Sequence, residues 1–327
     1  MNLPFVLAAC LRRFALVVAL ALLCLVPRAV LAQTCTFTMS NIAFGNVSTI
    51  TGAPVNANGT LTANCSGFTT SNIEFCLSIG IPTGGFSPRT MTGPGGTTLS
   101  YDLFSDTGYT TIWGSVGSTS FPERIVDVPL VGGVTSITLT VYGRVYAGQT
   151  TVQPGSYSQA FATTDTLFTY LGYTGTPPTC TGSSTPSARL SFNVSATVIP
   201  DCTLSAAPLA FPAMTTPGTQ VTANTSLSVT CVSGTPYTVA LNAGTTGGGT
   251  VASRFMLLNG GSATVNYDLY KDAAFSQLWG DGSNGTTTES GTGTGTAQTL
   301  TVFGRVPAQA AQPSGNYSDT VTATLTF

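Results

Sequence analysis

Six of the eight cysteines in this 327-residue chain have the spacing that most clearly allows chemistry; the other two, Cys10 and Cys24, lie in the N-terminal segment. The six follow this apolar segment and are Cys35, Cys65, Cys76, Cys180, Cys202 and Cys231. An even count in an exported chain predicts disulfides. Cys35 and Cys65 have almost the same spacing as Cys202 and Cys231, so an internal repeat favours one bridge in each copy. Cys76 and Cys180 would then pair with each other, although spacing alone leaves other connectivities open.

A metal site is the competing interpretation of these cysteines. The chain has no His and no C-x-x-C pair, so the usual zinc-ligand pattern is missing. Without His, neither a Ser-His-Asp nor a Cys-His pair can form. Asp102 and Asp268 could serve as general bases, but they recur at one place in both copies of the repeat, which favours a structural role. The sequence therefore predicts no enzyme and no cofactor.

The repeat consists of blocks that recur in the same order. In each copy a Tyr-Asp-Leu block precedes a Trp-Gly pair, then a Thr-Val-aromatic-Gly-Arg-Val block, then a Gly-x-Tyr-Ser turn. The first copy has Tyr101–Phe104, Trp113, Leu139–Val145 and Pro154–Ser158; the second has Tyr267–Tyr270, Trp279, Leu300–Val306 and Ser314–Ser318. This order predicts duplication of a whole domain. Both tryptophans are expected to pack in a core.

Composition favours β structure in both copies. Only 7% of the residues are charged, and short runs of β-branched and aromatic residues alternate with Gly, Pro and Asn turns. We therefore expect an all-β chain of two antiparallel β-sandwich domains. The low charge argues against a nucleic-acid partner, because such a partner requires a basic surface.

An alternating segment lies between the two copies, directly before Cys202. Apolar and polar residues alternate strictly over residues 189–199, with Leu190, Phe192, Val194, Ala196 and Val198 on the apolar face. The first copy ends near Tyr170, so this segment gives it one strand more than the second copy has. We interpret the segment as a strand that completes the first sandwich. The alternative is that it is simply the first strand of the second copy.

The first 32 residues have the pattern of a signal peptide. Arg12 and Arg13 precede the apolar run Phe14–Val26, and small or apolar residues lead to Ala32. A membrane anchor is the alternative, but the run is short for a bilayer span of about 20 residues. Cleavage would leave two expected domains, residues 33–199 and 200–327, in an exported chain.

The repeated blocks resemble the spore coat U-type domain, the subunit family of archaic chaperone–usher pili. The early cysteine pair, the Y-D-L-[FY]…W-G block, the T-V-[YF]-G-R-V block and the final P-x-G-x-Y-S…T-x-T-x-F stretch carry the resemblance over residues 35–327. The run F-N-V-S-A-T-V before Cys202 is similar to the donor segment of such subunits. The resemblance implies immunoglobulin-like sandwiches that lack their last strand.

The family mechanism implies several partners. A periplasmic chaperone lends a strand, and at the outer-membrane usher the next pilin subunit donates its own strand instead. No strand precedes Cys35 and the C-terminal copy is incomplete, so we expect a tip adhesin that accepts a strand and attaches the pilus to abiotic or host surfaces during biofilm formation. The alternative is a secreted structural coat or matrix protein built of two such domains.

Apolar loops of the first copy are the candidate surface-binding residues. The resemblance implies hydrophobic loop fingers at the tip, and the candidates are Ile81, Phe86, Phe121, Leu130 and Val131. An exposed apolar cluster would attach to a surface by excluding water. The alternative is that Phe86, Phe121, Ile125 and Leu130 fold back onto the sandwich.

Overall fold

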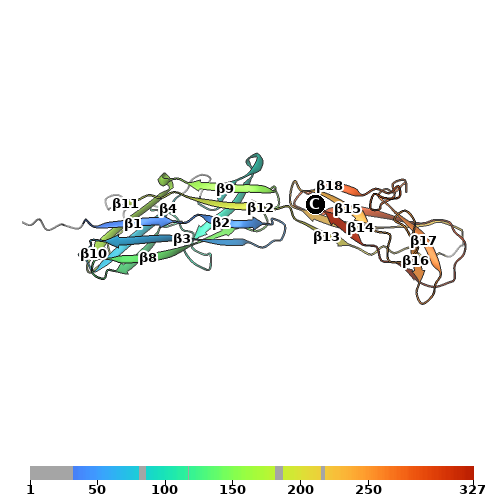
Figure 1. The fold of residues 1–327 in the computed structure, drawn as a ribbon, viewed down its shortest axis with the longest axis horizontal. Helices are drawn as coiled ribbons and strands as arrows, with labels where there is room; N and C mark the ends of the chain where they lie inside the picture. Colours follow the sequence, from blue (N-terminus) through green and yellow to red (C-terminus); the bar gives the residue numbers. More distant parts are fainter. Residues whose placement is uncertain (1–31, 81–85, 117, 181–186, 215–217) are drawn as a thin grey trace, which may run out of the picture.

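A computed structural model describes residues 32–80, 86–116, 118–180, 187–214 and 218–327. These residues form two β-sandwiches placed end to end in an elongated molecule (Figure 1). We call them the first sandwich (β1–β12) and the second sandwich (β13–β21). The predicted all-β fold of two sandwich domains is confirmed. The predicted signal peptide lies outside the described residues, except for Ala32.

The first sandwich pairs a large sheet with a small one. In spatial order, the large sheet contains β1 (Thr34–Met39), β3 (Val55–Ser66), β8 (Thr135–Val145), β6 (Thr98–Phe104), β5 (Arg89–Thr92), β9 (Gly155–Phe161), β12 (Phe192–Val198) and β2 (Ile42–Val47). The small sheet contains β11 (Ser187–Ala188), β10 (Thr166–Tyr173), β4 (Asn72–Ile79) and β7 (Arg124–Pro129). All paired neighbours are antiparallel except β12 and β2, which run parallel. Short 3-10 turns occur at Pro94–Gly96 and Thr163–Asp165.

The second sandwich repeats this plan with fewer strands. Its larger sheet contains β13 (Cys202–Ala206), β14 (Val221–Cys231), β19 (Gln298–Val306), β17 (Thr264–Tyr270), β16 (Arg254–Leu258) and β20 (Tyr317–Ser318). Its smaller sheet contains β18 (Glu289–Thr292), β15 (Pro236–Leu241) and β21 (Ala323–Thr326). Among the described residues, no helix is long and apolar enough to cross a membrane.

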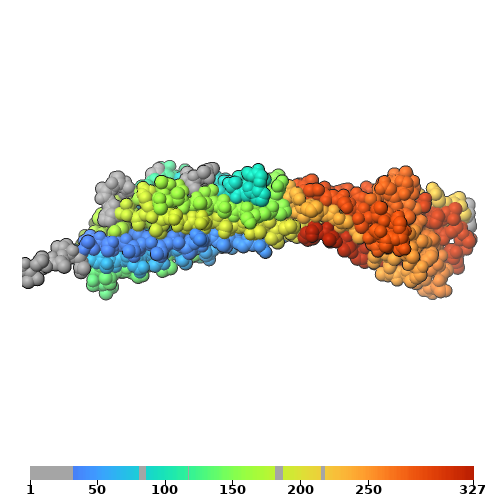
Figure 2. Space-filling view, turned by 45° about the horizontal axis from the view of Figure 1, so that its top comes forward, coloured from blue at the N-terminus to red at the C-terminus, as the bar shows by residue number. Residues whose placement is uncertain are grey.

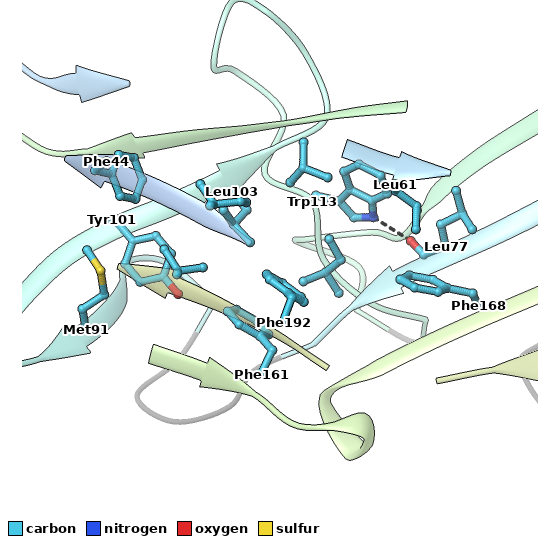
Figure 3. Close-up of a cluster of buried hydrophobic side chains, with 14 of the residues drawn as sticks. Phe44, Leu61, Leu77, Met91, Tyr101, Leu103, Trp113, Phe161, Phe168 and Phe192 are labelled. Carbon is cyan, nitrogen blue, oxygen red and sulfur yellow. Dashed lines mark hydrogen bonds between the residues drawn. The ribbon is translucent and has the colours of Figure 1, made fainter. Parts of the chain in front are cut away.

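The alternating strands bury one apolar face between the sheets, and a tryptophan lies at the centre of each core. Trp113 and Trp279 are each 1% exposed. The indole N–H of Trp113 donates to the carbonyl of Leu77 at 2.7 Å (Figure 3). That of Trp279 donates to the carbonyl of Val239 at 3.0 Å. A buried indole N–H requires such a partner. The expectation that both tryptophans are core residues is confirmed.

A buried arginine bridges the two sheets in each sandwich. Arg89, on β5 of the large sheet, donates to the carbonyls of Ile79 (3.0 Å), Gly80 (3.4 Å) and Trp113 (2.8 Å). Arg254, at the same place in the second sandwich, donates to those of Leu241, Asn242 and Trp279. Each guanidinium thereby satisfies carbonyls where the central strand of the small sheet ends. Sequence analysis missed both residues, although an Arg-x-Met pattern recurs ahead of each Tyr-Asp-Leu block.

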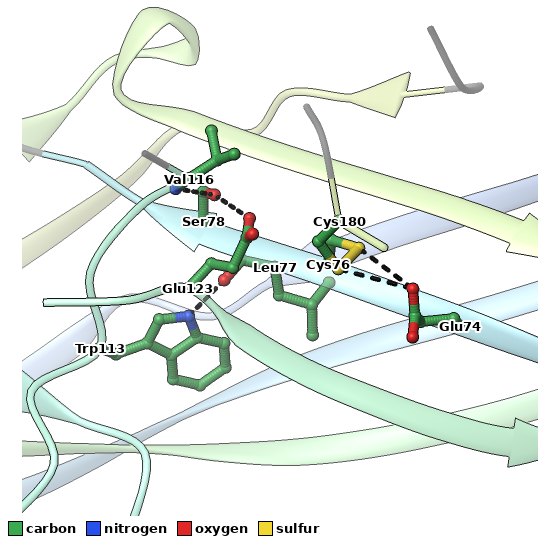
Figure 4. Close-up of a disulfide and its surroundings, with 8 residues drawn as sticks. All are labelled: Glu74, Cys76, Leu77, Ser78, Trp113, Val116, Glu123 and Cys180. Carbon is green, nitrogen blue, oxygen red and sulfur yellow. Dashed lines mark hydrogen bonds between the residues drawn. A yellow bond between two sulfur atoms is a disulfide. The ribbon is translucent and has the colours of Figure 1, made fainter. Parts of the chain in front are cut away.

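The described residues contain three disulfides, and they are the pairs that the repeat favoured. Cys35–Cys65 and Cys202–Cys231 each join directly opposed residues of antiparallel strands. Cys76–Cys180 fastens the segment after β10 to β4 (Figure 4). Disulfides form in oxidising compartments, so the chain is suited to folding outside the cytoplasm.

The two sandwiches contact each other through a packed joint, and the space-filling view shows them in continuous contact along the long axis (Figure 2). Val232, directly after Cys231, is 0% exposed and belongs to the apolar cluster of the first sandwich, together with Val152. Ser48 donates to the Asp201 carboxylate at 2.6 Å. Gly295 lies so close to the carbonyl of Thr150 that a Cβ would collide with it. The joint is therefore a specific interface as well as a covalent link.

Candidate functional site

The segment between the two repeats is hydrogen-bonded into the first sandwich. β12 lies between β9 and β2, pairing antiparallel with one (Phe192 opposite Phe161) and parallel with the other (Val194 opposite Ile42). The inward side chains of Phe192, Val194, Ala196 and Val198 are at most 5% exposed. Phe192 stacks on Phe161, with ring centroids 4.3 Å apart (Figure 3). This segment therefore fills the strand position between β9 and the edge strand β2.

The strand is shorter than the alternation over residues 189–199 predicts, because β12 begins only at Phe192. Directly before the predicted segment, β11 pairs with β10 in the small sheet, with Ala188 opposite Phe168. The chain then crosses to the large sheet. Leu190 lies at the crossing, half-buried, and its N–H and carbonyl both bond to the Thr166 hydroxyl at 2.8 Å. Residues 187–198 thus complete the edge of one sheet and an interior position of the other.

The second sandwich contains counterparts of both strands that flank β12 in the first sandwich, β9 and β2. β20 matches β9, with Tyr317 and Ser318 in place of Tyr157 and Ser158. Residues 209–211, Leu-Ala-Phe, stand seven residues after Cys202, just as Ile-Ala-Phe at 42–44 follows Cys35. This recurring signal was available in the sequence and was overlooked.

Close contacts confirm that residues 209–211 occupy the place of β2. Gly143 of the first sandwich packs beneath Ile42 and Phe44, and Gly304 of the second packs beneath Leu209 and Phe211. The ring of Phe211 lies 6.2 Å from that of Tyr267, matching the 6.1 Å between Phe44 and Tyr101.

Between these walls the second sandwich has an open apolar groove. Among the described residues, no strand lies between residues 209–214 and β20. Two adjoining cavities of about 650 and 550 Å³ occupy the space, and they share Leu209, Phe211, Met256 and Tyr317. Leu227, Leu269 and Val302 also line it. An extended strand with alternating apolar side chains would cover this surface and pair with the free backbone edge.

Asp319 holds the free edge of the groove in place. Its carboxylate accepts hydrogen bonds from the N–H groups of Thr245 (2.9 Å) and Thr246 (3.0 Å) and from the Tyr267 hydroxyl (2.7 Å). Burial opposes its ionisation, but the hydrogen bonds outweigh burial and lower the pKa of Asp319. Side-chain bonds thus anchor a stretch of chain that has no ladder partner on one side.

The candidate surface-binding residues do not form one cluster. Phe86 and Phe121 are half-buried and contact each other, with ring centroids 5.7 Å apart. Leu130 packs against the core, while Val131 is 77% exposed. Phe121 precedes β7 and Val131 follows it, so the two groups lie toward opposite ends of that strand. Ile81 lies outside the described residues.

The first sandwich has further exposed apolar side chains: sequence analysis did not single out Val134 or Leu171, and it considered Ile125 only as a residue that folds back onto the sandwich. Val134, 52% exposed, closes a tight turn with Val131 at the end away from the second sandwich. Ile125 and Leu171, on β7 and β10, are 54% and 40% exposed. The V-G-G-V spacing at residues 131–134 was the sequence signal that could have indicated the exposed position of Val134.

The third disulfide lies beside a buried carboxyl group. Glu74 is 4% exposed, and its Oε1 lies 3.8 Å from the sulfur of Cys76 and 3.6 Å from that of Cys180 (Figure 4). Burial, then the charges of Asp127 and Glu123, raises the pKa of Glu74. Both sulfurs are bonded to each other, so this cluster offers no thiolate to a metal.

Comparison with protein families gives two matches to the Spore Coat Protein U domain, at residues 20–164 and 188–324, which together cover most of the chain. The chain belongs to the Spore Coat Protein U domain family. Membership indicates a structural protein and not an enzyme. The second match begins ahead of β12, so β12 goes with the second repeat by sequence and with the first sandwich by hydrogen bonding. A search of curated proteins gave no match.

One solved structure supports the fold of this Spore Coat Protein U chain. The chaperone–tip adhesion subunit pre-assembly complex CsuC–CsuE, from archaic chaperone–usher Csu pili of Acinetobacter baumannii, aligns with a TM-score of 0.52 at 18% identity, covering 89% of this chain and 100% of that one. The CupB6 tip adhesin from Pseudomonas aeruginosa aligns with a TM-score of 0.37 at 12% identity, covering 89% and 93%.

Proposed function

We propose that this protein is a pilus subunit whose second sandwich accepts a β-strand from another polypeptide. The observation that carries the proposal is the groove between residues 209–214 and β20, which stands where β12 lies in the first sandwich. Backbone hydrogen bonds would supply affinity, and alternating apolar side chains would supply the fit. A periplasmic chaperone would fill the groove first, and the next pilin subunit would replace it at the outer-membrane usher.

The same proposal places domain boundaries at 33–199 and 200–327. The first unit is the sandwich that β12 completes within the chain, and the second is the strand acceptor. Export by the N-terminal signal would bring the chain to the periplasm and then to the cell surface. The similarity to a structure titled as a chaperone–tip adhesion subunit complex supports this assignment through the shared fold.

A comparison of the two sandwich ends supports a terminal position for the first sandwich. In the second sandwich, the end that docks on its neighbour has glycines, with the Gly234 N–H bonded to the Gly293 carbonyl. In the first sandwich, Phe68 and Gly133 make the equivalent bond, and Val131 and Val134 project beside it. At the docked end, glycines leave a flat surface on which the neighbouring sandwich packs. At the free end, exposed valines project instead, which suits attachment to a surface better than docking on another subunit.

Appending a strand to the second sandwich is expected to make it fold without a chaperone. In the first sandwich, residues 171–199 lead from β10 back through β12, so the same residues added after Phe327 should reach the groove. We expect the unmodified mature chain to be degraded when expressed alone in the periplasm, and the fusion to accumulate as a protease-resistant protein. Limited proteolysis and yield measure the difference.

A matched fusion carrying Val194→Asp in the appended copy alone serves as the control, because a buried charge should block insertion. An unmodified chain that accumulates in stable form without chaperone or fusion would contradict the proposal. That result would favour the secreted coat or matrix protein, whose domains need no added strand.

Replacing the exposed valines is expected to lower attachment to apolar surfaces. The Val131→Ser, Val134→Ser double variant removes the largest exposed apolar side chains at the free end, and exposed substitutions change stability by only about 0.5 kcal/mol. Adhesion of assembled pili to polystyrene should fall while pilus number stays constant. The matched variant Leu257→Ser removes a 39% exposed side chain from the second sandwich and should leave attachment unchanged. Equal attachment by both variants would show that the turn at residues 131–134 is not the adhesive site.

A further inference from the structure

The joint between the two sandwiches provides a template for the far end of the second sandwich. At the joint, residues 147–153 of the first sandwich form a loop against which the second sandwich docks. Val152 of this loop is 4% exposed and lies in one apolar cluster with Val232. A Cβ added at Gly234 would lie in ordinary van der Waals contact with the side chain of Gln153, and one added at Gly295 would collide with the carbonyl of Thr150. This docking surface sits beside the end of β12.

The second sandwich has an equivalent loop at residues 307–313. Gln149 fixes the first loop by bonding to both backbone groups of Ser100, at 2.6 and 2.9 Å. Gln309 bonds in the same way to Asn266, at 3.1 and 3.0 Å. This shared anchor places Ala310 at the position of Thr150 and Gln312 at the position of Val152.

The equivalent loop is exposed and lies at the open mouth of the groove. Ala310, Ala311 and Gln312 are exposed, and all three line the 650 Å³ cavity between Leu209 and Tyr317. Met214, at the position of Val47, is 40% exposed on the opposite side of the same cavity. In the first sandwich the position that corresponds to this cavity is filled: the end of β12 and the side chain of Val232 both pack there.

We propose that residues 307–313 form a second docking surface, which contacts the folded body of the strand-donating subunit. The inference rests on the proposed function and extends it from the strand to the domain behind the strand. The partner is a sandwich whose donor strand runs through a short link into its disulfide-bonded first strand, as β12 runs through residues 199–201 into β13. Its contact residue is a small apolar side chain directly after its second cysteine, as Val232 is here.

The chemistry of the loop makes this contact weaker than the internal joint. Val152 offers Val232 an apolar surface, whereas Gln312 at the same position offers an amide that must be desolvated. The internal joint should therefore be stiff, and the joint to the next subunit should open more readily. Gln312→Val is expected to strengthen the contact, and Ala311→Asp is expected to remove it.

Two fusions of the mature chain separate the strand from the body. The strand fusion carries residues 171–199 after Phe327. The body fusion carries residues 171–327 and then 171–199, so that a second copy of the docking sandwich follows the inserted strand. Hydrogen exchange is measured at the groove edge, residues 317–321, and at the loop, residues 307–313. The loop at 147–153 is the docked reference within each molecule.

We expect the groove edge to be protected equally in both fusions, and the loop to exchange about tenfold more slowly in the body fusion alone. In the body fusion, Gln312→Val should slow the exchange of this loop further, and Ala311→Asp should return its exchange to the rate found in the strand fusion. Neither substitution should change the exchange of the loop in the strand fusion. Equal loop exchange in both fusions, with a protected groove edge, would overturn the second surface and leave strand acceptance intact. An unprotected groove edge in both would overturn strand acceptance and this inference together.

Discussion

Val194→Asp is expected to unfold the first sandwich of the mature chain. Val194 is 0% exposed at the middle of β12, between β9 and β2, and it belongs to the apolar cluster of the first sandwich. Burying an unpaired charge costs about 4–5 kcal/mol or more, which is comparable to the whole stability of a domain, about 5–15 kcal/mol. The free-energy cost should appear as the loss of one of two calorimetric transitions.

The measurement uses the fusion with residues 171–199 after Phe327, so that the second sandwich is folded and supplies the other transition. Thr197→Asp is the matched control, because Thr197 belongs to the same strand but is exposed on the outer face. That variant should shift the first transition by less than about 0.5 kcal/mol. If Val194→Asp left both transitions in place, β12 would not be a structural part of the first sandwich.

Arg89→Ala is expected to destabilise the first sandwich by about 3–5 kcal/mol, the cost of removing one partner of a buried pair. Arg89 is 1% exposed, and its Nη1 lies 3.4 Å from the carboxylate of Asp102, which is 0% exposed. Without the guanidinium, that carboxylate would lose its buried cation and keep the Tyr146 hydroxyl as a donor, and the carbonyls of Ile79 and Trp113 would lose the donor that Arg89 supplies. Urea unfolding followed by tryptophan fluorescence measures the change.

Arg144→Ala is the control for Arg89→Ala. Arg144 is half-buried on the outer face, where it bonds to Asn56 at 3.0 Å and lies 3.8 Å from the ring centroid of Tyr109. An exposed cation–π contact contributes about 0.5–1 kcal/mol, so this variant should cost no more than that. Equal destabilisation by the two variants would show that the buried carbonyl contacts of Arg89 contribute nothing beyond the loss of an arginine side chain.

The sequence alone could not assign the alternating segment to one of the two sandwiches. Alternation showed that Phe192 and Val194 face a core, but an alternating strand fits any sheet edge with the same period. Hydrogen bonds to β9 and β2 decide which core it is. The sequence also did not show that this strand begins only at Phe192, because the crossing from one sheet to the other does not interrupt the alternation of side chains.

The apolar loops show the same limit. Phe86, Phe121 and Val131 have similar hydrophobicity in the sequence, yet the first two contact each other and the third is exposed at the free end. β7 separates Phe121 from Val131 in space, and only the register of that strand with β4 determines where its two ends lie. Likewise, the core position of Val232 depends on the neighbouring sandwich.

By itself, the sequence determined the features that depend on local pattern and on repetition. These are two copies of one β-sandwich, an alternating segment between them, and cysteine pairs placed at matching positions. Each follows from the period of a strand or from the order of blocks along the chain. The tertiary structure decided which sandwich β12 completes, where the groove opens, which arginines are buried and how the two sandwiches dock. Those features arise from contacts between residues far apart in the chain, and the local patterns of a single sequence do not reveal such contacts.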